Sequence, residues 1–237
     1  MSSERSLRIR VFRRRLSLLC VVAFLLLTGS RAQAAPVAAA AFRDVHGLSP
    51  QALAAALDAV SCARARGVSG QSGLLTLIDY SLPSTQPRFW VLDLEHGRVL
   101  FHELVAHGAE SGDNYAVRFS NIDGSRQTSL GLFLTGSTYE GGNGYSLRLR
   151  GLDPGLNDRA EERAIVMHGA WYVSPDQIRR YGRLGRSWGC PALAKNIAPR
   201  VIDRIKDGTF LFAWSDRAAD ALRQGCKASG SVTVAGR

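Results

Sequence analysis

Hydrophobic residues recur along this chain at two spacings, and each spacing predicts a different kind of element. Leu53, Leu57 and Val60 repeat at helical spacing after Ser49 and Pro50. Serine is a favoured N-cap residue and proline is tolerated at the first helical position, so both residues support a helix that begins here. The pattern predicts one N-terminal helix, ending near residue 67, that packs against the domain following it.

From residue 74 onward, short apolar and β-branched runs replace the helical spacing. Glycine-rich turns separate these runs, and Glu95-His96-Gly97 joins two of them as a hairpin. Two short helical stretches, 176–180 and 199–206, interrupt the series. Strands outnumber helices, which predicts a mainly β fold with a few helices, arranged as a β-sandwich or a mixed β-sheet. The expected strands are residues 74–80, 89–94, 98–106, 131–136, 145–149, 164–168 and 209–214.

The net charge of +10 over 237 residues would by itself suggest a protein that binds nucleic acids or membrane surfaces. Most of that charge is local, because residues 1–34 contain seven arginines and a single acidic residue, Glu4. In the rest of the chain basic and acidic residues are interleaved, without a block of five like charges. Nucleic-acid binding is therefore not expected.

The first 34 residues are typical of a secretory signal peptide. An arginine-rich stretch precedes the apolar run 16–28, and Ala32-Gln33-Ala34 follows as an A-x-A cleavage pattern. This run is shorter than the roughly 20 residues that span a bilayer, which favours a cleaved signal over a permanent anchor. We expect cleavage after Ala34 and export to the periplasm or cell wall, with no stable membrane span afterwards. The export route and the oligomeric state are left open.

Cleavage of the signal would remove Cys20 and leave Cys62, Cys190 and Cys226. An odd number of cysteines in an exported protein leaves one thiol unpaired or paired between chains. Cys62 lies in the expected helix and Cys226 near the C-terminus, so a disulfide between them would tie the two ends of the mature chain together. Cys190 lies in a turn of small residues, where it is a disulfide partner, a core thiol or a reactive group.

The candidate chemistry lies at the end of one strand and in the turn that follows later. The apolar run 164–167 leads directly into His168-Gly169, and Ser187-Trp188-Gly189-Cys190 follows. An imidazole within hydrogen-bond reach can take the proton of a thiol and later protonate a leaving amine. A glycine before the cysteine lets a substrate carbonyl approach the backbone, where N–H groups can face a developing oxyanion. The pattern is what a Cys/His acyl-transfer site needs.

These residues resemble the signature of a known family. His168-Gly169 followed by Ser187-x-Gly189-Cys190 is similar to the H-G…S-x-G-C pattern of the L,D-transpeptidase (YkuD-type) catalytic domain, in its murein L,D-transpeptidase branch. The resemblance extends from about Leu74 to Trp214. Further matching stretches are Phe89-Trp90-Val91-Leu92-Asp93-Leu94, Val105-Ala106-His107-Gly108, Ser129-Leu130-Gly131, Gly144-Tyr145-Ser146-Leu147, Gly155-Leu156-Asn157 and His168-Gly169-Ala170-x-Tyr172-Val173.

The resemblance implies a mixed β-sandwich with the cysteine under a loop flap, and a two-step reaction on peptidoglycan stem peptides. Cys190 would attack the carbonyl of the third, L-centred residue of a tetrapeptide, release D-alanine, and pass the acyl group to an amine of another stem as a 3→3 cross-link. His168 would be the base and later the acid, with the Gly169 carbonyl orienting its ring. Ser187 would shape the turn, and the backbone of Gly189 and Cys190 would hold the oxyanion. No metal or organic cofactor is expected.

The sequence departs from the wider family beside the cysteine. Trp188 stands where a histidine is common, and Pro191-Ala192-Leu193 stands where an arginine or asparagine is common. Recognition of the substrate carboxylate is therefore unassigned. Arg186 and Arg159 are the candidates, because a planar guanidinium suits a carboxylate, although a solvated surface role is favoured for each.

Four further residues are candidates for substrate contact: Trp188, Tyr139, Ser129 and His107. His107 either lines the cleft or simply ends a strand. The glycine-rich segment 139–144 is a candidate lid over the substrate.

The sequence patterns predict a cleaved signal peptide at 1–34 and a helical segment at 35–73 that packs on the domain. The resemblance implies a catalytic domain at 74–216, followed by a C-terminal tail at 217–237. Three functions remain open. The leading one is peptidoglycan cross-linking by an L,D-transpeptidase. The second keeps the same acyl-enzyme but uses water as the acceptor, giving an L,D-carboxypeptidase, or a protein amine. The third is a non-catalytic cell-wall-binding domain that kept the fold.

Overall fold

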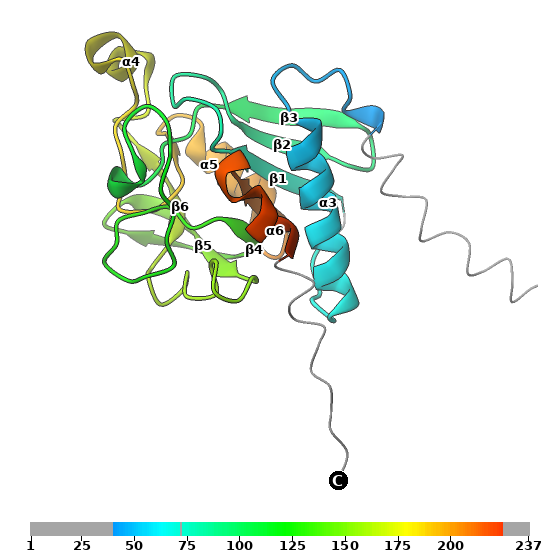
Figure 1. Cartoon of the computed structure of the whole chain (residues 1–237). Helices are drawn as coiled ribbons and strands as arrows, with labels where there is room; N and C mark the ends of the chain where they lie inside the picture. Colours follow the sequence, from blue (N-terminus) through cyan, green and yellow to red (C-terminus); the bar gives the residue numbers. More distant parts are fainter. Residues whose placement is uncertain (1–39, 72, 225–237) are drawn as a thin grey trace, which may run out of the picture. The chain divides into compact units, whose positions relative to one another are not determined.

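A computed structural model describes residues 40–71 and 73–224, and a mixed sheet of eight strands forms the centre of that part (Figure 1). The strand order is β3-β2-β1-β8-β4-β5-β6-β7. Only the pairs β1–β8 and β6–β7 are parallel. This confirms the expected mainly β class with a few helices. The strands are β1 (Leu74–Asp79), β2 (Phe89–Asp93), β3 (Arg98–Glu103), β4 (Gly131–Gly141), β5 (Gly144–Gly151), β6 (Val166–Ala170), β7 (Ala192–Ala194) and β8 (Phe210–Trp214).

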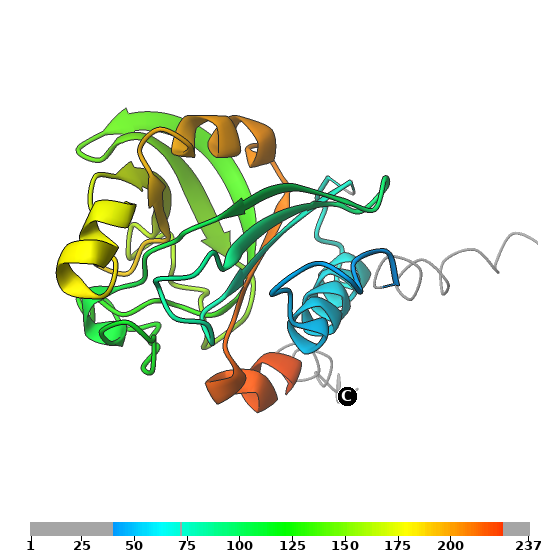
Figure 2. The ribbon, with the colours of Figure 1, turned by 90° about the horizontal axis from the view of Figure 1, so that it is seen from above.

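The middle of the sheet is the hydrophobic core. Every residue of β1, β2 and β8 is buried, as expected for strands that are covered on both faces. Helix α3 (Pro50–Ala65) packs on β1, β4 and β8, whereas α5 (Ala198–Ile205) packs on β5 and β6. Figure 2 shows these two helices on opposite sides of the strands.

Helix α3 begins where the sequence predicts. The Ser49 hydroxyl accepts a hydrogen bond from the Ala52 N–H at 3.2 Å, and Pro50 occupies the first turn. Cys62 in this helix is disulfide-bonded, and Cys190 is a free thiol. The expected partner Cys226 and the predicted signal peptide lie outside the described residues, so the pairing and the signal stay predictions. Among the described helices, none is long and apolar enough to cross a membrane.

One strand and one α-helix of the described residues were not expected. Strand β7 has three residues, too few to show a periodicity, and forms because β6 pairs with it. Helix α6 (Ala219–Gln224) lies in the segment expected as a tail and contacts α3. The domain boundaries stay predictions.

Strand ends also differ where tertiary contacts decide them. The expected strand 98–106 ends at Glu103, because the Val105 carbonyl turns to accept hydrogen bonds from Arg88. Strand β4 continues past Gly136 to Gly141, through a register shift in its pairing with β5. The predicted helical stretches form α4 (Pro175–Tyr181) and α5.

Candidate active site

Strands β6 and β7 bring the two candidate reactive residues to one edge of the sheet. His168 lies in β6 and pairs with Ala192 of the parallel strand β7, and Cys190 precedes Ala192 by two residues. Backbone pairing therefore brings His168 and Cys190 together although 21 residues lie between them in the sequence. The proximity that the sequence could only assume comes from this short parallel ladder.

His168 is 4% exposed, and one nitrogen of its ring forms a hydrogen bond. Nδ1 lies 3.1 Å from the carbonyl oxygen of Gly169. A carbonyl can only accept, so Nδ1 carries the proton and Nε2 presents a lone pair. Within the described part of the chain nothing hydrogen-bonds Nε2. Burial lowers the pKa of His168 below its ordinary value, and the hydrogen bond to Gly169 has a smaller, opposite effect. Because the pKa is lowered, the ring is neutral at neutral pH and can accept a proton.

The Cys190 thiol is held against the residues that lead into β6. The Val166 N–H donates to Sγ at 3.5 Å, and Sγ lies 3.8 Å from the Ala164 carbonyl oxygen. Burial raises the pKa of this thiol, and the Val166 N–H and the charge of Arg163 act in the opposite direction. The resting pair is thus a neutral thiol with a neutral imidazole, and no hydrogen bond joins Cys190 to His168 in the structure as described.

Ser187 and Gly189 fix the turn that carries the thiol. The Ser187 hydroxyl donates to the Cys190 carbonyl at 2.6 Å and accepts from the Gly189 N–H at 3.1 Å. Gly189 has φ +123°, and a Cβ there would lie 2.9 Å from the Gln127 carbonyl oxygen, so no other residue fits this position without strain. The turn is also tied to its neighbour, because the Ser187 N–H donates to the His107 carbonyl at 3.0 Å.

The hydrogen bonds of this turn bear on the expected oxyanion donors. The Gly189 N–H is already engaged by Ser187. The Cys190 N–H, in contrast, has no acceptor among the residues that the structure describes. The backbone group that can hold an oxyanion without losing another bond is therefore that of Cys190 itself.

A groove of about 470 Å³ opens beside His168. Its walls come from the tip of the β4–β5 hairpin, the end of β6 and the start of α5. Burial, and to a smaller extent the nearby Cys190, raise the pKa of the Tyr172 phenol to about 12. The hairpin tip at 142–144 falls within the glycine-rich segment 139–144, for which the sequence predicts a lid. The lining residues are Gly142, Asn143, Gly144, Tyr145, His168, Gly169, Ala170, Trp171, Tyr172, Lys195, Ala198 and Pro199.

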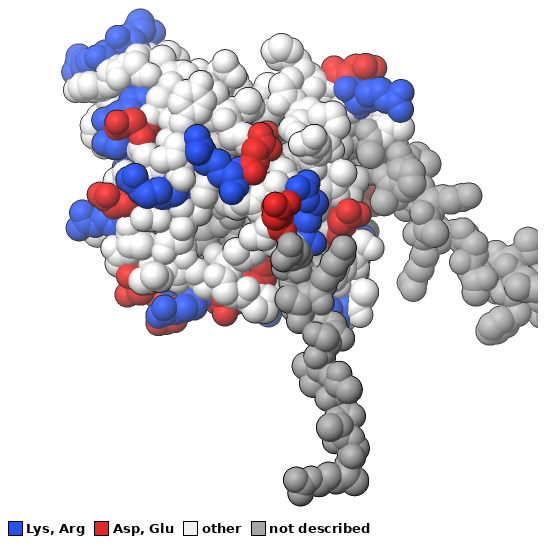
Figure 3. Space-filling model, viewed as in Figure 1, with Lys and Arg blue, Asp and Glu red and all other residues white. Residues whose placement is uncertain are grey.

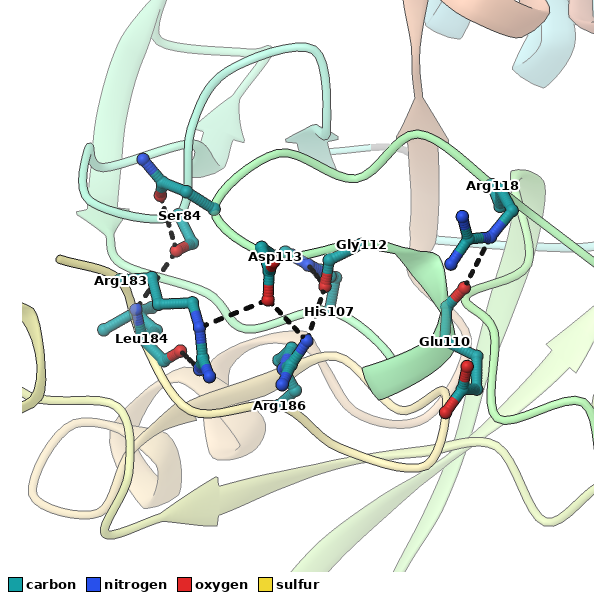
Figure 4. Close-up of polar contacts among 10 residues, drawn as sticks. Ser84, His107, Glu110, Gly112, Asp113, Arg118, Arg183, Leu184 and Arg186 are labelled. Carbon is teal, nitrogen blue, oxygen red and sulfur yellow. Dashed lines mark hydrogen bonds and ion pairs between the residues drawn. The ribbon is translucent and has the colours of Figure 1, made fainter. Parts of the chain in front are cut away.

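Of the two arginines considered for carboxylate recognition, Arg186 lies close to the turn but is already paired. Its guanidinium donates to the Gly112 carbonyl at 3.0 Å and to Asp113 at 2.9 Å. Arg183 reaches the same Asp113 oxygen at 3.5 Å, so two cations converge on one exposed carboxylate (Figure 4). Arg159 instead forms an exposed ion pair with Glu162 and does not line the groove.

The other candidate contact residues have separate environments. Trp188 is 74% exposed, with the Arg126 guanidinium 4.9 Å from its ring centroid. Tyr139 lies in β4 under the Arg148 guanidinium, at 4.4 Å, and does not line the groove.

His107 is 1% exposed and lies behind the turn, away from the groove lining. Arg88, itself fully buried, donates to Nδ1 of His107 at 2.7 Å, and Nε2 lies 3.3 Å from the Gly112 carbonyl oxygen. Burial, and then the neighbouring Arg88 charge, lower the pKa of His107 to about 3. Both ring nitrogens already have partners, which fits a structural residue. His107 neither lines the groove nor ends a strand, because β3 ends at Glu103.

Sequence reasoning missed Arg163, which lies directly before Ala164 and beside Cys190. The stretch Glu161-Glu162-Arg163 has the pattern of a solvated surface, and only the fold shows that the third residue turns inward. Ser129, expected to contact substrate, is 3% exposed and accepts a hydrogen bond from Arg163.

Charges on the visible face of the molecule are mixed. Figure 3 shows basic and acidic side chains interleaved rather than gathered in a patch of one sign. Over residues 40–71 and 73–224, no three His, Cys, Asp or Glu side chains come together as metal ligands would.

Comparison with known proteins gives one family and several related folds. The family model of the L,D-transpeptidase catalytic domain matches residues 44–214. A search of curated proteins finds no match.

Among solved structures, an L,D-transpeptidase from Mycobacterium smegmatis is similar at 15% identity and a TM-score of 0.38, covering 60% of this chain and 58% of that one. An L,D-transpeptidase from Stackebrandtia nassauensis is similar at 12% identity and a TM-score of 0.38, covering 78% and 91%. Residues 123–326 of an L,D-transpeptidase from Xylanimonas cellulosilytica are similar at 16% identity and a TM-score of 0.34, covering 71% of this chain and 81% of that one. This chain spans less than two thirds of the length of the M. smegmatis structure.

Proposed function

Because the chain belongs to the L,D-transpeptidase catalytic domain family, we propose that it is an exported peptidoglycan L,D-transpeptidase with Cys190 as the nucleophile. The observation that supports this most is the pairing of β6 with β7. It brings a free thiol and a buried histidine with an unoccupied Nε2 to one sheet edge, next to a groove.

In the first half-reaction, Nε2 of His168 takes the proton from Cys190 Sγ. The sulfur then attacks the carbonyl carbon of the third stem residue, and the N–H of Cys190 holds the resulting oxyanion. The bond from this carbon to the nitrogen of D-alanine breaks, and His168 returns the proton to the leaving amine. The product is a thioester on Cys190 and free D-alanine. Donation from Nδ1 to the Gly169 carbonyl keeps the ring in the tautomer that both transfers need.

In the second half-reaction, an acceptor amine attacks the thioester. His168 removes a proton from this amine and protonates the departing sulfur, which restores the thiol and leaves a 3→3 amide. The groove lined by the β4–β5 hairpin and Tyr172 offers a path for one of the two peptides. The donor that holds the oxyanion is the N–H of Cys190, and His168 carries the proton in each half-reaction.

Water or a protein amine could resolve the same thioester, and these acceptors define the alternative functions. A non-catalytic wall-binding domain would need neither the thiol nor the free Nε2 lone pair. The presence of both groups at one edge favours an enzyme.

The proposal is tested by incubating the mature protein with purified disaccharide tetrapeptides and resolving the products by mass. We expect cross-linked dimers and stoichiometric release of D-alanine. Cys190→Ala should give no product, and Ser174→Ala, on the N-cap of α4 outside the groove, should behave as the wild type.

Other product patterns decide among the alternatives. Tripeptide without dimers would assign an L,D-carboxypeptidase, and a stem attached to an added protein would assign a protein acceptor. Identical profiles for the wild type and Cys190→Ala would overturn the enzymatic proposal.

A further inference from the structure

Arg163 joins two segments that are far apart in the sequence. It is half-buried directly before Ala164, and its guanidinium donates four hydrogen bonds into segment 120–129. The planar guanidinium of arginine can donate to several acceptors at once. The acceptors are the Ser120 carbonyl at 2.7 Å, the Ser129 hydroxyl at 2.5 Å, the Ser125 hydroxyl at 3.1 Å and the Gln127 carbonyl at 2.9 Å.

The same guanidinium borders the turn that carries the nucleophile. A Cβ placed on Gly189 would lie 3.5 Å from Nη2 of Arg163 and 2.9 Å from the Gln127 carbonyl oxygen that Nη2 binds. The next residue, Ala164, has φ +52° and lies with its carbonyl oxygen 3.8 Å from Cys190 Sγ. Arg163 therefore lies beside Gly189 of the turn 187–190, and its backbone neighbour Ala164 lies beside the thiol.

Arg163 has donor capacity beyond these bonds. Its Nε is buried and has no hydrogen-bond partner in the described residues. The four acceptors are neutral, so the positive charge has no bonded carboxylate. Among charged side chains, Asp123 raises the pKa of Arg163 and Arg159 lowers it. A cation that is desolvated but not neutralised by a direct partner can act on other nearby groups.

The other titratable groups around Cys190 are uncharged at neutral pH. Burial raises the pKa of Tyr80, at the end of β1, and of Tyr172, after β6. Burial lowers the pKa of His168. Arg88 lies beyond Tyr80, with its guanidinium 5.1 Å from that ring centroid.

We propose that Arg163 is a positioning residue for Cys190: it holds segment 120–129 against the turn 187–190 and stabilises the negative charge that forms on Sγ when the proton leaves. The second effect rests on Cys190 being the nucleophile of the proposed function. Both effects arise from one guanidinium, so a variant that keeps hydrogen bonds and one that keeps charge will separate them.

The experiment follows alkylation of Cys190 by iodoacetamide between pH 6 and pH 10. In this reaction the thiolate sulfur forms a bond to carbon and iodide leaves, while the thiol proton goes to His168 or to buffer. Peptide mass mapping assigns the label to Cys190. The variants are Arg163→Gln, which removes the charge but can still bond the loop, and Arg163→Lys, which keeps the charge. Arg159→Gln, an exposed arginine four residues earlier, is the matched control.

We expect Arg163→Gln to alkylate about threefold to tenfold more slowly than the wild type at pH 7.5, and to reach its maximum rate at higher pH, because less thiolate is present. Arg163→Lys should restore the pH profile towards that of the wild type, and Arg159→Gln should match it. A folded Arg163→Gln protein with an unchanged profile would overturn the proposal. Equal profiles for the Gln and Lys variants would also overturn it.

A second measurement needs no variant. A cation beside the thiolate attracts an anionic reagent, so iodoacetate should react with wild-type Cys190 faster, relative to iodoacetamide, than it does with glutathione. This advantage should shrink as salt is added. A ratio equal to that of glutathione would contradict the proposal even if Arg163→Gln fails to fold.

These readouts do not require a peptide substrate. A shifted alkylation profile without any cross-linked product would support the role of Arg163 and overturn the proposed transpeptidase function. Cross-linked product together with an unshifted alkylation profile would support the transpeptidase function and overturn the role of Arg163.

Discussion

Two buried histidines, His168 and His107, are held in opposite tautomers. His168 donates from Nδ1 to a carbonyl and leaves Nε2 without a partner. His107 accepts at Nδ1 from Arg88, and therefore carries its proton on Nε2, facing the Gly112 carbonyl. Burial lowers the pKa of both rings. The comparison teaches that burial makes a histidine neutral, whereas the unoccupied nitrogen makes it useful as a base.

The largest effect should come from the histidine with the unoccupied nitrogen. We expect His168→Gln to slow acylation of Cys190 by a tetrapeptide about 10²- to 10⁴-fold, since glutamine cannot take the thiol proton. Single-turnover acylation followed by intact mass measures this rate. His96→Gln, on the exposed β2–β3 turn, is the control and should change nothing. A loss smaller than about tenfold would remove His168 from the role of base.

A smaller loss of acylation rate should follow from a substitution in the turn that carries Cys190. Ser187→Ala removes the donor to the Cys190 carbonyl and the acceptor for the Gly189 N–H. We expect acylation to fall about tenfold, because the thiol is then held less firmly in its attacking position. The same single-turnover assay measures the change. An unchanged rate would show that glycine geometry alone sets the turn.

The structural histidine should affect stability rather than chemistry. His107→Leu leaves the buried Arg88 cation without one acceptor, so we expect the free energy of unfolding to fall by about 2 to 4 kcal/mol. Acylation should stay within about threefold of the wild type, because the His107 carbonyl still accepts from Ser187. Denaturant titration and the acylation assay are measured on the same protein. A hundredfold loss of acylation in the folded variant would contradict a purely structural role.

The smallest effect is a difference in pH dependence. The folded pKa of His107 is about 3, below the ordinary 6.5, so the unfolded chain binds its proton first. Stability therefore falls as the pH drops from 6.5 towards 3, and His107→Leu should show a shallower fall. Acylation should be lost only at a pH below 6.5, where His168 becomes charged, and this limb should persist in His107→Leu. Thermal unfolding and acylation measured over this pH range test both statements.

How far the sequence predicts the molecule depends on the range of the interactions. Helix α3 and strands β1, β2 and β8 follow from local patterns, because a capping serine and continuous apolar runs specify them without help from distant residues. Strand β7 does not, since only pairing with β6 forms it.

The candidate site divides in the same way. His168, Gly169, Ser187 and Cys190 could be named from their pattern, and the structure places them at one edge. Arg163 could not, because its inward orientation depends on acceptors about 40 residues earlier in the chain. Arg159 and Arg163 have similar sequence surroundings, and only the packed loop distinguishes the exposed ion pair of Arg159 from the half-buried cation of Arg163.

The parallel β6–β7 ladder also has an evolutionary consequence. Parallel neighbours require a crossover, and here the crossover is the segment 171–191, which includes α4 and the arginines of the Asp113 cluster. The spacing of His168 and Cys190 is set by the ladder, and α4 has no buried residue and does not line the groove. Exchange of the loop around α4 would therefore leave the placement of His168 and Cys190 intact.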